Sequence, residues 1–359
     1  MRGPGGCRSR RSGTPGGRMN AARWPREQPD SGRLLHVAPR SGRLDDVRMS
    51  ELPRMLRPGD LLVLNDAATL PAALHGRTEA GAPIELRLVA REEEGTWTAV
   101  LFGAGDWRMR TEDRPLPPSV SPGERLVLGG LGARVVAVLP PSPRLLRVSF
   151  EARGAALWSA LYRAGRPVQY AHVERPLALW HIQTAYAARP WAVETPSAGL
   201  PLTWALLLDL KRRGVRLASL THAAGLSSTG DAVLDAALPR PERFDVPAAT
   251  VEAVHATRAA GGRVVAVGTT VVRALEGRAA QTGGRLEAGE GVTDLLLGPG
   301  FVPRVVDGLL SGMHEPGTSH FTLLQAFAPV ELLRAATVFA EARGYLGHEF
   351  GDSCLLLDP

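Results

Sequence analysis

Two patterns of hydrophobic and polar positions divide the chain at about Phe150. Between Leu74 and Phe150, short apolar runs of strand length alternate with turns rich in Gly and Pro. The runs are Ile84–Val89, Trp97–Phe102, Arg125–Leu128, Arg134–Leu139 and Leu145–Phe150. This arrangement is typical of a small β-sandwich or β-barrel. Gly129 and Gly130 superficially suggest a nucleotide-binding loop, but no helical pattern follows them, which favours a hairpin turn.

Beyond Phe150 the apolar positions predict alternating helices and strands. Helices are predicted at 151–164, 202–213, 247–260, 270–278, 319–327 and 329–343. Strands are predicted at 215–220, 263–267, 293–297 and 353–357, with a further apolar segment at 304–310. Upstream, the chain predicts strands at 33–37 and 61–64 and a short helix at 49–56. The predicted fold is an α/β body, residues 29–73 and 151–359, with an inserted small β-barrel domain, residues 74–150.

The first 28 residues have a different composition. Residues 1–28 are rich in Gly, Arg, Pro and Ser without apolar periodicity, which predicts a disordered basic tail. Residues 1–27 contain seven Arg and one Glu, so they account for the whole net charge of +6. The rest of the chain is electrically balanced and gives no compositional argument for nucleic-acid binding. A start at Met19 and an Arg-rich transit peptide are alternatives to a native tail.

The composition and the absence of several known sequence motifs exclude a number of protein classes. A chain of 359 residues, 44% of them hydrophobic, can bury a sizeable core, and no apolar stretch approaches the roughly 20 residues of a membrane span. Its two Cys form neither a disulfide framework nor a CxxC site. We therefore expect a cytoplasmic, monomeric protein. HExxH, P-loop, GxSxG and GxGxxG patterns are absent from the expected places, so we expect no metal site and no Rossmann methyltransferase or dehydrogenase.

The segment GGRVVAVGTTVVRALE, residues 261–276, is the most informative one. It predicts a buried strand, a tight turn at Gly268 and a helix that Thr269 or Thr270 can cap. The free amides of such a helix start favour an anionic or polar ligand group, and Arg273, one turn later, could reach the same point. An ordinary strand-to-helix connection with a surface Arg explains the segment equally well.

Three further clusters place polar side chains at turns. GVTDLLLGPGFVPRVVDGLLSGMHEP, residues 291–316, brings Asp294, Asp307, His314 and Glu315 near turns, where acids and a His can transfer protons. Thr195 and Ser197 lie in a polar loop that precedes a predicted helix. Asn65 and Asp66 end a strand, where α/β proteins commonly place ligand groups. Capping and plain turn roles remain alternatives for all of them.

The order and spacing of these segments resemble the S-adenosylmethionine:tRNA ribosyltransferase-isomerases of queuosine biosynthesis. The matching motifs are PGDLLVLND, P-A-x-L-x-G at 71–76, AVGTT-x-VR, G-x-TD at 291–294, PGF with VVDGLL, M-H-x-P at 313–316 and the closing GDSCLLL. TPSAGLPLT and LTHAAGL, which contains His222, match more loosely. The resemblance covers roughly residues 31–357 and implies an α/β body interrupted by a small β-barrel.

The resemblance also implies a reaction. Such enzymes move the ribosyl unit of S-adenosylmethionine onto the aminomethyl-deazaguanine base of a tRNA, isomerise it to the epoxycyclopentanediol of epoxyqueuosine, and release adenine and methionine without a metal. S-adenosylmethionine is then a co-substrate, and its sulfonium acidifies the neighbouring C5′–H so that a positioned base can remove the proton. On this basis the expected catalytic residues are Asp66, Asp307 and His314. The expected substrate-binding residues are Asn65, Thr195, Ser197, His222, Thr269, Thr270 and Arg273.

Departures from the family pattern bear on the acceptor. The usual Thr-Arg after Asn-Asp is Ala67-Ala68, a later Arg is Ala73, and an expected Lys is Gly317. In addition, Pro201 replaces an expected His and Glu315 an expected Leu. Because phosphate contacts dominate affinity for nucleic acids, we expect weakened tRNA binding. Two alternatives stay open, namely a divergent S-adenosylmethionine-cleaving transferase with another acceptor, and a catalytically inactive RNA- or metabolite-binding homologue.

Overall fold

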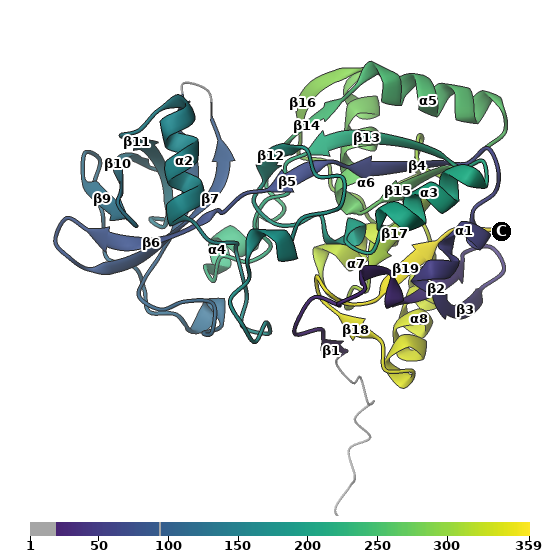
Figure 1. Cartoon of the computed structure of the whole chain (residues 1–359), viewed down its shortest axis with the longest axis horizontal. Coiled ribbons are helices and arrows are strands. Elements are labelled where there is room, and N and C mark those ends of the chain that lie inside the picture. Colours follow the sequence, from purple (N-terminus) through teal and green to yellow (C-terminus); the bar gives the residue numbers. More distant parts are fainter. Residues whose placement is uncertain (1–18, 93–94) are drawn as a thin grey trace, which may run out of the picture.

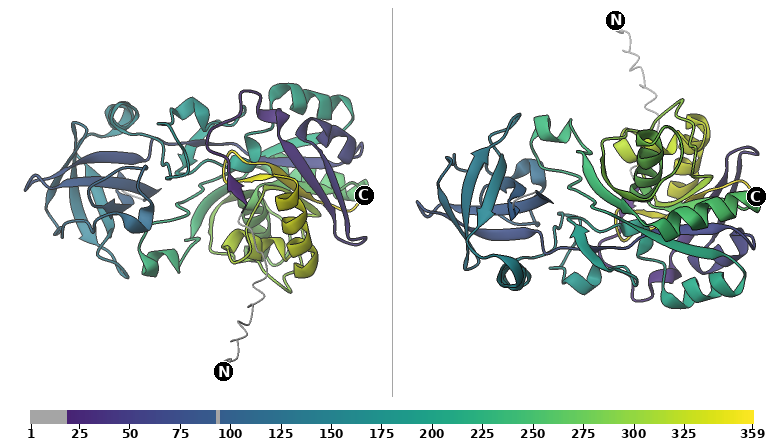
Figure 2. Two further views of the ribbon diagram at one scale, coloured as in Figure 1. Left: turned by 90° about the horizontal axis from the view of Figure 1, so that it is seen from below. Right: turned by 90° about the horizontal axis from the view of Figure 1, so that it is seen from above.

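The computed structural model describes residues 19–92 and 95–359, and it consists of two bodies at opposite ends of the long axis (Figures 1 and 2). One is a closed β-barrel and the other is an α/β body built on a nine-stranded sheet. The predicted fold class, an α/β body with an inserted small β-barrel, is confirmed. Most of the predicted basic tail, residues 1–18, lies outside the described residues. Among those described, no helix is long and apolar enough to cross a membrane.

The large sheet has a parallel centre with antiparallel strands on either side. Its order is β16 (Gly289–Thr293), β14 (Glu242–Val246), β13 (Arg216–His222), β4 (Leu61–Asn65), β15 (Val264–Val267), β17 (Gly308–Gly312), β19 (Ser353–Leu356), β2 (Arg33–Ala38) and β3 (Arg43–Arg48). The four central strands β13, β4, β15 and β17 run parallel. They therefore all end at the same edge of the sheet.

Helices cover both faces of this sheet, and the central strands β4 and β15 each contain four successive apolar residues. In β4, Leu61 and Val63 point to one face and Leu62 and Leu64 to the other, as the two-residue period of a strand requires. The first face packs against α5 (Ala248–Ala259), α6 (Thr269–Gln281), α7 (Ser319–Leu324) and α8 (Val330–Ala342). The second packs against a 3-10 turn (Met49–Glu51), α1 (Leu52–Met55) and α3 (Trp204–Arg212). Burial on both faces explains the continuous hydrophobic runs.

The barrel follows the predicted strands closely. It closes in the order β10 (Leu131–Val138), β11 (Leu145–Phe150), β8 (Trp97–Phe102), β7 (Pro83–Arg91), β6 (Ala73–Thr78) and β9 (Arg125–Leu128). Gly129 and Gly130 both have positive φ and join β9 to β10 as a hairpin. α2 (Gly154–Ala164), expected to open the second part of the α/β body, instead buries Leu157 and Leu161 in the barrel core.

Two strands connect the bodies. β5 (Ala67–Thr69) continues from β4 toward the barrel, and β12 (Arg189–Ala192) pairs with it in parallel, so both strands run toward the barrel. The remaining short elements are α4 (Ala232–Asp235) and 3-10 turns at Pro29–Ser31, Thr111–Asp113, Leu179–His181 and Ser197–Gly199. The segment with α4 also reaches the barrel, where Arg144 donates to the backbone oxygens of Thr229 and Gly230.

The N-terminal boundary predicted at residue 28 differs from the structure. Residues 19–28 belong to the packed body, where β1 (Asn20–Ala21) pairs with β18 (Leu346–Gly347). Met19 and Ala22 are buried, and Arg26 forms an ion pair of 2.6 Å with the buried Asp352. The segment was assigned to the tail because its few apolar residues show no period, whereas they pack individually against the distant C-terminal part.

One predicted strand and one predicted apolar segment differ in their bounds from the observed strands, and β14 is among the strands that were not predicted. The strand expected at 293–297 is β16 at Gly289–Thr293, and the apolar segment at 304–310 contributes β17 at Gly308–Gly312. β14 at Glu242–Val246 has alternating polar residues and was not predicted. Its position at the edge of the parallel centre brings Glu242 to the end of the sheet where the candidate site lies.

Candidate active site

The predicted polar residues meet at the edge where the parallel strands end. Asn65 and Asp66 follow β4, His222 ends β13, and Thr269 begins the helix after β15. His314 lies two residues beyond the end of β17. Because these strands are neighbours in one sheet, their carboxyl ends form one continuous surface. This edge faces the two-stranded connection to the barrel.

Asn65 organises the surface through its side-chain amide. Its Nδ2 donates to the backbone oxygen of His222 at 3.0 Å and to Oγ1 of Thr270 at 3.2 Å. Its Oδ1 accepts from the backbone nitrogens of His222 and Ala67 at 2.9 and 3.1 Å. The amide therefore joins three elements of the site. Both of its donors are used within the protein, so it positions neighbours rather than offering a free donor to a ligand.

Asp66 presents a partly exposed carboxylate beside Asn65. Oγ1 of Thr221 donates to one carboxylate oxygen at 2.6 Å, and Oγ of Ser219 donates to the other at 3.2 Å. The two hydroxyls fix the orientation of the carboxylate. Burial, followed by the negative charge of Asp66, raises the pKa of the phenol of Tyr186. Asp66 is thus an oriented acid next to a phenol that stays protonated.

The start of α6 differs in detail from its prediction. Gly268, with φ of +87°, is the N-cap residue, and no side chain caps the described helix start, so neither Thr269 nor Thr270 has the expected capping role. A Cβ on Gly268 would contact Ala198 at 3.4 Å. The loop that holds Thr195 and Ser197 therefore lies directly against the turn. Open amides and nearby hydroxyls make this place suitable for a polar ligand group.

Arg273 is not at the surface and does not extend to the helix start. Its side chain is 5% exposed and forms an ion pair with Glu242. The guanidinium also donates to the backbone oxygens of Leu295, Thr293 and Arg240, at 3.1, 3.3 and 3.4 Å. Its interactions anchor β14 and β16 to α6. The expected direct contact with a ligand is replaced by an indirect connection through Glu242.

His222 lies fully buried next to this ion pair. Its Nε2 is 3.5 Å from Oε2 of Glu242. Burial, and then the charge of Arg273, lowers the pKa of His222 to about 3. Burial also raises the pKa of Glu242. Neither ring nitrogen of His222 has a hydrogen-bond partner among the described residues. The imidazole is therefore neutral and lies behind the site surface.

His314 is the second histidine at this edge. Its Nε2 is 2.8 Å from Oγ of Ser311, and its ring stacks on His320 at a centroid distance of 4.9 Å. Burial, followed by the proximity of His320, lowers the pKa of His314 to about 3. The imidazole is neutral at physiological pH and is held in place by β17 and α7. It can accept a proton or donate through one N–H.

Asp307 lies at the opposite edge of the sheet. It precedes β17, and its Oδ2 accepts from the backbone nitrogen of Val264 at the beginning of β15 at 2.8 Å. Four or five strand residues at about 3.3 Å each separate it from the edge that holds Asp66 and His314, which is about 15 Å. Asp307 therefore cannot act on the same atoms as those two residues. Asp294 follows β16 with an exposed side chain.

A pocket between barrel and body adds residues that the sequence did not indicate. Its volume is about 290 Å³, and its walls include Trp97 and Trp158 from the barrel side, and Trp191, Glu242 and Arg243 from the body. The guanidinium of Arg243 lies 4.1 Å above the ring of Trp191. Nε1 of the buried Trp97 has no partner among the described residues. Such a pocket suits a flat aromatic ring with polar edges.

No sequence signal could have revealed this pocket. Its three Trp come from a barrel strand, from α2 and from β12, and Glu242 comes from an unpredicted strand. They share no motif and become neighbours only when the barrel docks beside the sheet edge. Glu242 links the two parts of the site, since it lines the pocket and pairs with Arg273.

Comparison with known proteins adds independent evidence. The family model of the queuosine biosynthesis protein matches residues 18–356. The S-adenosylmethionine:tRNA ribosyltransferase-isomerase of Acidiphilium cryptum is 37% identical, covering 92% of this chain and 94% of its own. That of Thermus thermophilus is 36% identical with the same coverages. The crystal structure of the S-adenosylmethionine tRNA ribosyltransferase of Thermotoga maritima is 28% identical, with a TM-score of 0.51 over 94% of this chain and 96% of that one.

Proposed function

The chain belongs to the S-adenosylmethionine:tRNA ribosyltransferase-isomerases, and on this premise we propose how its residues divide the reaction. The enzyme transfers and isomerises the ribosyl moiety of S-adenosylmethionine onto the aminomethyl-deazaguanine base of tRNA. Epoxyqueuosine is formed, and adenine and methionine are released. The names of the relatives favour neither a different acceptor nor an inactive binding protein.

The observation that carries the assignment is the convergence of Asp66, Thr270 and His314 at one sheet edge beside an aromatic pocket. S-adenosylmethionine would lie along this edge, with a polar group at the open start of α6. The acceptor base would enter the pocket and stack on Trp191, because stacking on aromatic rings holds bases taken out of a helix. The loop with Thr195 and Ser197 would border the donor.

We assign proton transfer to Asp66 and His314. When bound, the sulfonium of the donor acidifies the adjacent C5′–H. Asp66 is the base, because its carboxylate is partly exposed and oriented by the hydroxyls of Thr221 and Ser219. His314 is a neutral imidazole fixed by Ser311, and it relays to the departing adenine the proton that Asp66 has removed, accepting it on the ring before donating it. Asp307 has no part in the chemistry. Asn65 and Arg273 position the groups that contact the substrates.

Binding of tRNA must rely on arginines other than those typical of the family. Ala67 and Ala68, which replace Thr-Arg, lie in β5, and Arg189 pairs in register with Ala67 on the adjacent strand β12. Arg91 and Arg243 line the pocket from opposite sides. We assign phosphate contacts to these three arginines. We further propose a monomeric enzyme of the cytoplasm, which is supported by a site built from one chain and by a tRNA substrate.

The test uses purified protein, S-adenosylmethionine and tRNA carrying the aminomethyl-deazaguanine base. Adenine release and the mass shift of the nucleoside are measured for the wild type, for Asp66→Asn and for the control Asp307→Asn. We expect Asp66→Asn to lose at least about 100-fold in turnover, as for a general base, and Asp307→Asn to retain the wild-type rate. An active Asp66→Asn enzyme would refute the assignment. Adenine release without a nucleoside shift would indicate another acceptor, and no donor consumption an inactive protein.

A further inference from the structure

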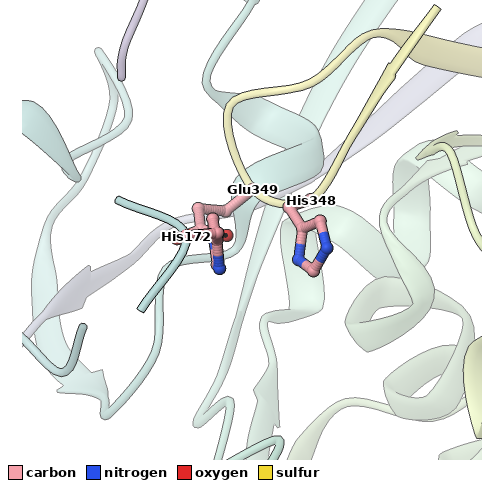
Figure 3. A group of neighbouring side chains, drawn as sticks. All are labelled: His172, His348 and Glu349. Atoms are coloured by element: carbon pink, nitrogen blue, oxygen red, sulfur yellow. Dashed lines mark hydrogen bonds and ion pairs between the residues drawn. The ribbon is translucent and has the colours of Figure 1, made fainter. Parts of the chain in front are cut away.

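Three side chains of types that can bind a metal lie close together, apart from the residues at the sheet edge described above. His172 belongs to the loop between α2 and β12, and His348 and Glu349 belong to the turn between β18 and β19. The two segments are far apart in the sequence, yet Figure 3 shows the three side chains side by side. One ligand atom from each lies within 4.8 Å of the others.

The geometry is close to that of a bound ion. Nε2 of His172 lies 2.8 Å from Oε2 of Glu349, and the His172 and His348 rings are 4.2 Å apart at an angle of 33°. Tetrahedral zinc with bonds of about 2.0–2.1 Å separates its ligand atoms by about 3.4 Å. On metal binding, the largest distance between two of the three ligand atoms would therefore shrink by little more than about 1 Å, which side-chain rotation can provide.

The backbone and the charge around the cluster support a ligand role. His348 has φ of +65°, the only positive φ of a non-glycine residue in the described chain, and the backbone nitrogen of Gly351 donates to its oxygen at 2.9 Å. This left-handed turn is energetically costly, and it places two side chains that can bind a metal, His348 and Glu349, next to each other. Burial, and to a smaller extent the charge of Glu349, raises the pKa of Glu194, so a second carboxylate lies nearby. A cation would relieve this concentration of acidic groups.

We propose that His172, His348 and Glu349 bind one divalent transition-metal ion, with zinc as the best fit. Two imidazoles and one carboxylate favour Zn²⁺, Ni²⁺ or Cu²⁺ over Mg²⁺ and Ca²⁺, which prefer oxygen ligands. Three protein ligands leave a fourth position to water. The ion fastens the loop between barrel and body to the C-terminal turn. It takes no part in ribosyl transfer, so the proposal stands apart from the assignment of the active site.

The test measures zinc binding to the full-length protein after treatment with EDTA and dialysis. Titration calorimetry with ZnCl₂ should give one equivalent for the wild type, and zinc should raise its Tm. Glu349→Gln keeps a hydrogen-bonding group opposite His172 but removes the anionic ligand, and His348→Asn keeps a residue that tolerates the left-handed backbone. Both should weaken zinc binding at least about 10-fold. His255→Ala, which removes an exposed histidine of α5, is the matched control and should bind as the wild type does.

A second imidazole pair allows a decisive comparison. His314 and His320 also stack, so zinc could bind there instead. Loss of the zinc equivalent in Glu349→Gln with retention in His320→Ala supports the proposal. The proposal is overturned if the wild type binds no zinc at neutral pH, if Glu349→Gln and His348→Asn bind it unchanged, or if His320→Ala alone abolishes binding. Similar melting temperatures of wild type and Glu349→Gln without metal would assign the difference to zinc rather than to folding.

Discussion

Replacing Arg273 by Met is expected to lower the free energy of unfolding rather than to remove a direct contact with a substrate. The side chain is 5% exposed and compensates the charge of Glu242, whose side chain is 11% exposed. Met has a similar length and fills most of the space but provides neither charge nor donors. The substitution therefore isolates the electrostatic part of the interaction.

The size of the effect follows from the groups that lose their partner when Arg273 is replaced. Glu242 would lose its counter-charge, and the backbone oxygens of Leu295, Thr293 and Arg240 would lose a donor. Removing one partner of a buried ion pair typically costs about 3–5 kcal/mol. Since a domain is stable by only about 5–15 kcal/mol, this is a large fraction of the free energy of unfolding.

The assay is denaturant unfolding followed by Trp fluorescence, with Arg278→Met as the control. Arg278 lies on the same helix, is partly exposed and donates only to the backbone oxygens of Glu287 and Ala288, so its loss should cost at most about 2 kcal/mol. A second variant, Arg273→Met with Glu242→Gln, removes the uncompensated charge. It should recover part of the stability lost in the single variant.

The pH dependence gives a further check on the cause. Burial already raises the pKa of Glu242 in the folded protein, and loss of Arg273 raises it further. The unfolded state then releases its proton at lower pH than the folded state, so the stability of Arg273→Met should fall as the pH rises above about 4.5. The double variant should lack this slope. Equal unfolding midpoints for Arg273→Met and Arg278→Met, or a slope of the opposite sign, would refute the argument.

Three further outcomes are expected. Trp191→Ala should weaken tRNA binding by about 1–3 kcal/mol, measured by fluorescence anisotropy, and leave the affinity for S-adenosylmethionine unchanged. Deletion of residues 1–27 should lower the Tm by at least about 2 °C relative to deletion of residues 1–18, because it also removes the ion pair of Arg26; equal values would contradict this. Because the pKa values of His222 and His314 are lowered to about 3, the unfolded state binds protons at these residues below about pH 6.5 while the folded state does not. The free energy of unfolding should therefore decline from about pH 6.5 toward pH 3, and each His→Gln variant should show a smaller decline.

The sequence predicted those parts of the fold that depend on local pattern. β4 and β15 were recognised because four successive apolar residues between turns have few alternatives to a buried strand. β14 was not, because Glu242 and Asp245 alternate with apolar residues in a short run that equally suits a loop. The helix at Gly154–Ala164 was predicted, but its partner was not, since an amphipathic helix does not encode which sheet it covers.

The site residues also divide into those that the local sequence pattern indicated and those whose position depends on contacts between distant segments. Asn65 and Asp66 were indicated as candidates because they end a strand, and Thr270 because it begins a helix; the structure places Asn65 in contact with Thr270. Asp307 was included through its motif, although one strand length separates its end of β17 from the others. Arg273 looked like a ligand contact from its place in the helix, whereas burial and Glu242 decide where its guanidinium lies. Contacts between distant segments, such as His172 with Glu349, leave no trace in spacing.

The paired strands β5 and β12 determine how the two bodies can move. The two strands share backbone hydrogen bonds in parallel register. A single-strand linker would permit rotation in any direction, but a two-stranded ribbon resists twisting and bending within its own plane. The segment that holds α4 adds a second connection, because Arg144 of the barrel donates to the backbone oxygens of Thr229 and Gly230. Any change in the width of the aromatic pocket must therefore flex the ribbon and the α4 segment together.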